Sequence, residues 1–237
     1  MSDKLSTGLQ VRWRASPNCG VRRLAAQPDM IVLHYTAMNT AQAAEDRLCD
    51  PDFEVSAHYL IGRDGQITQL VDERARAWHA GAGRWGSVTD VNSRSIGIEL
   101  DNDGQSEFAE SQMVALMALM PGIMRRWRIR PWRVIGHSDM APGRKIDPGP
   151  MFDWHRLARA RQAVWPQVEA ADKADVEKFR AGATAFGYSP DLDDIALISA
   201  FRLRFAPTND GPLTAHETAA AHDLGRRFPV DRAEQPA

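Results

Sequence analysis

R-V-I-G-H-S-D-M-A-P-G-R-K-I-D-P-G-P-M-F, at residues 133–152, is the stretch around which the rest of the chain is organised. Its β-branched pair at 134–135 predicts a short strand that leads to His137. A loop rich in proline and glycine follows and carries Lys145 and Asp147. A strand that presents an imidazole, followed by a loop that presents an amine and a carboxylate, is typical of a metal-assisted catalytic site. It is much less typical of a loop that only connects two secondary-structure elements.

The segments before this stretch predict alternating strands and helices. Residues 30–33 form a continuous apolar run, typical of a strand buried on both faces, and the run ends at His34. The pair Asp64–Gly65 lies between two strand-like segments and predicts a hairpin. The other expected elements are an irregular lead-in at 1–28, a strand at 95–101, and helices at 41–49, 111–127 (kinked or split at Pro121) and 154–164. This order predicts an α/β fold with a mixed central sheet flanked by helices.

The C-terminal part of the chain has the periodicity of three helices. Apolar residues recur at helical spacing in three segments after Trp165, and Thr214 with Glu217 predicts a capping box at the start of the last helix. We therefore expect a first domain at 1–165 and a small three-helix domain at 166–237. A module of about 70 residues is close to the lower limit for independent folding, so we expect it to dock on the first domain.

The composition is that of an ordinary globular protein, with 43% hydrophobic and 25% charged residues. A formal net charge of -2 gives no electrostatic reason to expect nucleic acid as a partner. We expect Cys19 and Cys49 to be free thiols. No apolar run is long enough for a membrane span, and the first residues lack an apolar export segment, which predicts a cytoplasmic protein. A native start further upstream would predict a periplasmic one. We expect a monomer.

Two of the seven histidines lie where an apolar strand gives way to a loop. These are His34 and His137, and with Asp147 they can converge at one rim of a sheet. A catalytic zinc site takes three protein ligands and leaves a fourth position open, so this set predicts zinc. Glu99 alternates onto the same strand face as small residues and is the candidate general base; the alternative is an exposed-face glutamate. Lys145 can offset charge on an oxyanion, although a lone loop lysine is usually only solvated.

Residues 30–155 resemble the zinc-dependent N-acetylmuramoyl-L-alanine amidases of amidase family 2, which are related to the peptidoglycan recognition proteins. The matching segments are I-V-L-H-Y-T at 31–36, S-A-H-Y-L-I-G-R-D-G-Q-I at 56–67, A-W-H-A-G at 77–81, N-S-R-S-I-G-I-E-L at 92–100 and G-H-S-D-M-A-P-G-R-K-I-D-P-G-P at 136–150. The resemblance implies the peptidoglycan-recognition-protein type of α/β fold and a single Zn²⁺ per chain.

The resemblance also implies roles for individual residues. His34, His137 and Asp147 match zinc ligands, Glu99 matches the acid/base residue, and Lys145 matches the residue that stabilises the transition state. Four further residues fall in segments that shape the sugar and peptide groove of the family: Trp78, His79, Arg84 and Asn92. Residues 200–218 are similar to small peptidoglycan-binding helical domains, and the alternative is a helical cap that only supports the first domain.

The expected function is hydrolysis of the amide between N-acetylmuramic acid and L-alanine of the peptidoglycan stem peptide. The substrates would be muropeptides, including 1,6-anhydro-muropeptides recycled in the cytoplasm. Alternatives are an amidase that acts on intact peptidoglycan, in the periplasm or as a phage-type lytic enzyme, and a non-catalytic muropeptide-recognition module. A non-catalytic relative is expected to lose a ligand or the acid/base glutamate, and this chain keeps all five residues.

Overall fold

A computed structural model describes residues 9–168 and 172–231 of the chain. Its main sheet has six strands in the order β1-β5-β4-β7-β3-β8. The central strands β3 (Met30–Tyr35), β7 (Ser95–Leu100) and β8 (Val134–Gly136) are parallel, as are β4 (Tyr59–Ile61) and β7. β5 (Ile67–Gln69) pairs with β4 in antiparallel orientation, as the Asp64–Gly65 turn predicts. The expected mixed sheet is confirmed.

Residues expected to form an irregular lead-in contain two short strands, so that expectation was partly wrong. β1 (Val11–Trp13) extends the main sheet beside β5, and β2 (Cys19–Val21) pairs with β6 (Ala75–Ala77) in a separate ribbon. Both lead-in strands have three residues and are largely exposed, so no apolar alternation marks them in the sequence. The first eight residues of this segment lie outside the described part of the chain.

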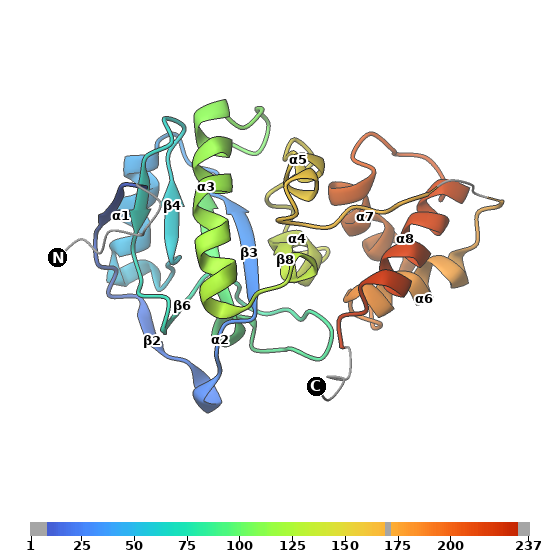
Figure 1. The fold of residues 1–237 in the computed structure, drawn as a ribbon, viewed down its shortest axis with the longest axis horizontal. Coiled ribbons are helices and arrows are strands. Elements are labelled where there is room, and N and C mark those ends of the chain that lie inside the picture. Colours follow the sequence, from blue (N-terminus) through green and yellow to red (C-terminus); the bar gives the residue numbers. More distant parts are fainter. Residues whose placement is uncertain (1–8, 169–171, 232–237) are drawn as a thin grey trace.

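Helices cover both faces of the main sheet (Figure 1). The longest, α3 (Glu110–Trp127), packs its apolar stripe on Ile31, Leu33 and the isoleucines of β7. α1 (Ala41–Cys49) begins at Thr40, whose hydroxyl accepts a hydrogen bond from the Ala43 amide, and it covers Leu60. The shorter helices near the site are α2 (Val91–Arg94), α4 (His137–Met140) and α5 (Trp154–Arg159).

Of the kink or split expected at Pro121, the split does not occur, because α3 continues through this residue. Proline has no N–H to donate to the carbonyl four residues earlier, which belongs to Met117. The Gln162 side chain replaces that donor, and its Nε2 lies 2.8 Å from the Met117 carbonyl oxygen. The same contact helps to explain why α5 ends at Arg159, short of the expected residue 164: the chain turns at Arg161 (φ 59°) and leads Gln162 back to α3.

The three C-terminal helices are α6 (Val176–Phe186), α7 (Asp194–Phe205) and α8 (Ala215–Arg227), and the capping box at Thr214 is present. They lie beside α4 and α5, at the β8 edge of the sheet (Figure 1). One hydrophobic core joins both regions: Met30, Val32, Ile135 and Met140 on one side, and Phe179, Phe186 and Phe201 on the other. The expected docking is confirmed.

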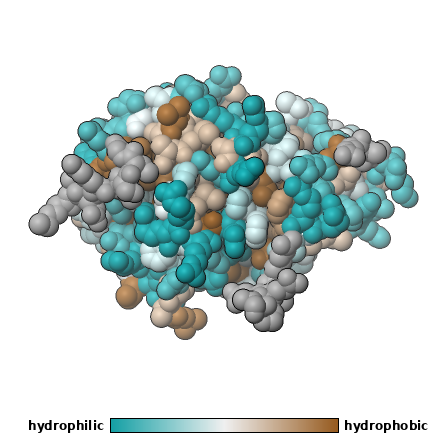
Figure 2. Space-filling view, in the orientation of Figure 1, coloured by the Kyte–Doolittle hydropathy of each residue, from teal (hydrophilic) through white to brown (hydrophobic). Residues whose placement is uncertain are grey.

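On the face drawn in Figure 2 the surface is mainly polar, and hydrophobic residues show only in small patches. Within the described residues, no helix is both long and apolar enough to cross a bilayer. Cys19 and Cys49 are free thiols, as expected.

Candidate active site

The site is built where the three parallel central strands end. His34 and Glu99 are direct partners in the register of β3 and β7, and Leu33 is the partner of Gly136 at the end of β8. Adjacent residues of parallel strands point to the same face, so His34 and Glu99 lie side by side. His137 follows Gly136 and is the first residue of α4. Strand pairing therefore brings together residues that are more than 100 positions apart.

The potential metal ligands converge on one point. His34 Nδ1 lies 3.0 Å from His137 Nδ1, and Asp147 Oδ2 lies 2.9 Å and 3.0 Å from these two nitrogens. All three side chains are buried, and one ligand atom from each lies within 4.8 Å of the others. Two imidazole nitrogens and a carboxylate oxygen are a donor set that suits Zn²⁺.

The hydrogen bonds on the far side of each imidazole fix its tautomer. The Ala80 carbonyl can only accept, so His137 Nε2, at 2.9 Å, must donate to it. This leaves a lone pair on His137 Nδ1, the atom that faces His34 and Asp147. A second partner of this kind is the usual means of orienting a metal-binding histidine.

His34 is oriented in the same way through His79 and Ser95. The Ser95 hydroxyl donates to the Val91 carbonyl at 2.6 Å, so it accepts from His79 Nε2 at 3.1 Å. Burial, followed by repulsion from neighbouring charges, lowers the pKa of His79 well below its usual value, so the ring is neutral. Its Nδ1 must then accept from His34 Nε2 at 3.0 Å. The lone pair of His34 is thereby placed on Nδ1 as well.

Burial also sets the charges of the site. Desolvation, reinforced by repulsion from His137, lowers the pKa of His34 to about 4, which keeps this ring neutral. Although burial opposes it, the adjacent His137 and His34 rings hold the pKa of the Asp147 carboxyl below its usual range, so this group is ionised. A neutral His34 imidazole and an ionised Asp147 carboxylate are the protonation states that a metal requires of these ligands.

Glu99 and Lys145 line the same cavity of about 510 Å³ as the three potential ligands, together with Trp78 and His79. Desolvation, with repulsion from the Asp147 carboxylate, raises the pKa of Glu99 well above its usual value. Its Oε2 is buried and has no hydrogen-bond partner among the described residues. A half-buried carboxyl with a raised pKa, in a cleft, is what a general acid/base requires.

Comparison with known proteins gives the same chemistry. The model of a family described as N-acetylmuramoyl-L-alanine amidase matches residues 24–150, which is more than half of the chain. The chain belongs to this amidase family. It is an enzyme that hydrolyses the amide between N-acetylmuramic acid and L-alanine of the stem peptide.

Similar proteins cover both regions of this amidase. AmiD of Escherichia coli K12 is 32% identical over 234 residues, covering 85% of this chain and 84% of AmiD. The solved complex of E. coli AmiD with anhydro-N-acetylmuramic acid-L-Ala-D-gamma-Glu-L-Lys has a TM-score of 0.78 at 33% identity, covering 88% and 93% of the two chains. AmpDh3 of Pseudomonas aeruginosa has a TM-score of 0.74 at 29% identity, covering 97% and 99%. The 1,6-anhydro-N-acetylmuramyl-L-alanine amidase AmpD of Haemophilus influenzae is 45% identical over 103 residues, covering 43% and 56%.

Two residues expected in the substrate groove of the amidase do not line the cavity. The Arg84 guanidinium reaches Asp191, at 3.3 Å, in the C-terminal region. Asn92 is buried, and its Oδ1 accepts hydrogen bonds from the backbone amides of His79 (3.0 Å) and Ala80 (2.8 Å). Asn92 thus holds the loop that supports both histidines, and substrate contact by either residue stays a prediction.

Sequence reasoning missed Arg144 and Tyr35, which also line the cavity. Arg144 Nη2 donates to the Ala80 carbonyl at 2.8 Å and also to the Ala82 carbonyl. It therefore links the loop that carries Asp147 to the loop that carries His79. Both residues lie inside quoted family segments, next to Lys145 and His34, and that proximity was the available signal.

Proposed function

We propose that this chain is a zinc-dependent amidase in which His34, His137 and Asp147 hold one Zn²⁺. The observation that carries the proposal is the convergence of both histidine Nδ1 atoms and Asp147 Oδ2, with tautomers fixed by Ala80 and His79. A bound zinc supplies Lewis acidity: it polarises a carbonyl oxygen and lowers the pKa of a water molecule toward about 7.

The remaining chemistry falls to residues of the chain. Glu99 accepts a proton from the attacking water and passes it to the nitrogen of the leaving L-alanine. The raised pKa of its carboxyl supports this role, because a group that takes and returns a proton works best near the ambient pH. Lys145, on the rim of the same cavity, offsets negative charge on the oxygen of the scissile amide. Trp78, half-buried at the cavity wall, offers a surface for the sugar.

The substrate we favour is a muropeptide that carries the 1,6-anhydro sugar. Two similar proteins were solved with such ligands, E. coli AmiD with an anhydro-muramyl tripeptide and P. aeruginosa AmpDh3 with an anhydromuramic pentapeptide. Intact peptidoglycan is the second candidate, and the C-terminal region supports it. This region would form a separate domain at 166–237 that binds the polymer.

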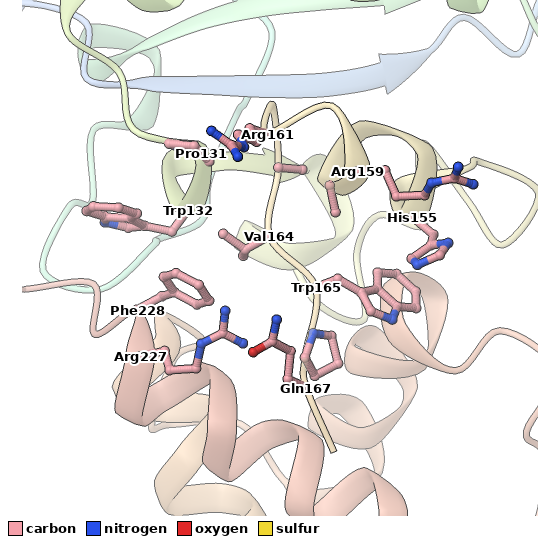
Figure 3. A pocket seen from close by; sticks show the side chains of 13 residues that line it. Pro131, Trp132, His155, Arg159, Arg161, Val164, Trp165, Gln167, Arg227 and Phe228 are labelled. Atoms are coloured by element: carbon pink, nitrogen blue, oxygen red, sulfur yellow. The ribbon is translucent and has the colours of Figure 1, made fainter. Parts of the chain in front are cut away.

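A hollow of about 530 Å³ at the junction of the two regions suits that second candidate (Figure 3). Trp132 stacks on Phe228 at one end, with ring centroids 5.9 Å apart, and Trp165 meets His155 at the other. Among the described residues, its lining holds arginines and no acidic residue and shares no residue with the metal cavity. Aromatic faces and guanidinium groups suit sugar rings and the carboxylates of stem peptides.

One experiment tests the reaction and the substrate together. A defined 1,6-anhydro-muropeptide and purified sacculi are incubated side by side with the enzyme, and the products are identified by mass spectrometry. We expect release of the free stem peptide from the anhydro-muropeptide, loss of release with a zinc chelator, and recovery with added zinc. Full activity of the metal-free protein would overturn the zinc mechanism, and release from sacculi alone would overturn the recycling role.

Location and assembly remain predictions. Cell fractionation tests the cytoplasmic location expected from the sequence, since a periplasmic enzyme would meet the sacculus instead of recycled fragments. Light scattering tests the expected monomer.

A further inference from the structure

A buried polar cluster joins the C-terminal helices to the segment that carries His137. At its centre is Asp139, in α4, which is fully buried. The Tyr188 hydroxyl donates to Asp139 Oδ1 at 2.5 Å. Arg204 Nη1 and the Gly136 backbone amide donate to Oδ2, each at 2.8 Å. The cluster thus links the C-terminal region to Gly136 and Asp139, which lie on either side of the proposed ligand His137.

Arg204 also contacts the far end of the same segment. Its guanidinium carbon lies 4.1 Å from the centre of the Trp154 ring, and Trp154 begins α5 just after the loop that carries Asp147. The Trp154 ring lies so close to Gly136 that a methyl group on that glycine would be 3.3 Å from it. One arginine of α7 therefore touches both ends of the segment that supplies two of the three proposed ligands.

Stability alone is a poor reason for such a cluster. Burying a guanidinium and a carboxylate carries a large desolvation penalty, and apolar residues of similar volume often stabilise a protein as well or better. Arg204 is only 2% exposed, and its Nε and Nη2 have no hydrogen-bond partner among the described residues. A hydrogen-bonded ion pair, unlike an apolar contact, fixes the orientation of the two side chains that form it. Here it fixes Asp139 against the amide that precedes His137.

On the basis of the zinc-dependent function above, we propose that Arg204 and Tyr188 are positioning residues of the metal site. Through Asp139 they hold Gly136 in place, and with it the His137 ring between the Ala80 carbonyl and Asp147. The C-terminal helices are then a working part of the catalytic site, in addition to any role in binding the polymer. Residues that orient a metal ligand typically change metal affinity 10- to 100-fold when they are replaced.

The test compares zinc affinities in the full-length protein, measured by competition with a chromogenic chelator. Arg204→Met should weaken zinc binding about 10- to 100-fold. Tyr188→Phe removes only the hydroxyl and keeps the ring that packs against Trp85 and Phe201. This variant should weaken zinc binding about 3- to 10-fold. The melting temperature of each metal-free variant shows that it is folded.

The chain offers a matched control two residues from Arg204 in α7. Arg202 forms its ion pair with Glu217, at 2.6 Å, entirely within the C-terminal region. Arg202→Met should lower the melting temperature and leave zinc affinity within twofold of wild type. Equal zinc loss in the Arg202 variant would overturn the positioning role and leave only general destabilisation.

The remaining outcomes are also decisive. Unchanged zinc affinity in folded Arg204→Met and Tyr188→Phe, with tight binding by wild type, overturns the positioning role but not the zinc mechanism. If Arg204→Met does not fold, Tyr188→Phe decides alone. Failure of wild type to bind zinc overturns both proposals.

Discussion

Gly97→Ala tests the hydrogen-bond chain behind His34 with a single methyl group. Gly97 lies in β7, and a Cβ atom built there would be 2.4 Å from His79 Cγ. Ordinary contact begins at 3.4 Å, so the ring must retreat by about 1.0 Å. The His34 and His58 rings hold it from other sides, with centroids 5.1 Å and 5.8 Å away. A shift of this size changes the length and the angle of the 3.0 Å bond that His79 Nδ1 accepts from His34 Nε2, on which the His34 tautomer depends.

The expected result is a folded protein with a weakened metal site. Overpacking of this kind costs about 1–3 kcal/mol of stability. Loss of the partner that fixes a histidine tautomer should reduce zinc affinity about 10- to 100-fold, measured by chelator competition. Gly122→Ala in α3 is the control, because nothing lies within 4 Å of its new methyl group, and it should stabilise the helix by about 0.5–1 kcal/mol. If Gly97→Ala is folded and binds zinc as wild type does, the proposed role of His79 is wrong.

Three further predictions concern charged residues. Glu99→Ala should retain zinc but lose about 10²–10⁴-fold in kcat, whereas loss of the metal would show that its role is structural. Lys145→Met should lose about 10²–10³-fold in kcat with little change in zinc affinity, and an equal rise in KM alone would point to substrate binding. Burial opposes ionisation of Glu217, but Arg202 and Thr214 lower its pKa to about 2. Its ion pair should therefore contribute about 2 kcal/mol above pH 4.5, and the stability difference between wild type and Glu217→Gln should vanish as pH falls toward 2. A difference that is constant with pH in chemical denaturation would contradict this.

The sequence predicted the parts of the site that depend on local pattern. Apolar runs that stop at a histidine placed His34 and His137 at strand ends, and the alternation around Glu99 put it on the site face. The capping box at Thr214 and the hairpin at Asp64–Gly65 were also found, because each depends on a few neighbouring residues.

Features that depend on tertiary contact could not be predicted in this way. Pro121 has the local character of a helix breaker, and only Gln162, from a distant turn, supplies the missing donor. The bond between Arg204 and Asp139 joins residues 65 positions apart, with no periodicity that relates them. His79 lines the cavity, in keeping with the groove role expected of it, but the contact of its buried ring with His34 depends on tertiary structure and has no local signal.

Because His34 and Glu99 are partners in adjacent strands, the site forms only when β3 and β7 pair in the native register. Side chains alternate along a strand, so a slip of one residue would turn one of the two to the opposite face of the sheet. Such a misfolded chain could keep its helices and much of its compactness, yet it would have no place for both groups at once. The fraction of amide cleavage recovered after refolding would therefore report the fraction of molecules in which the central strands pair in the native register. Measurements of helix content do not report this fraction.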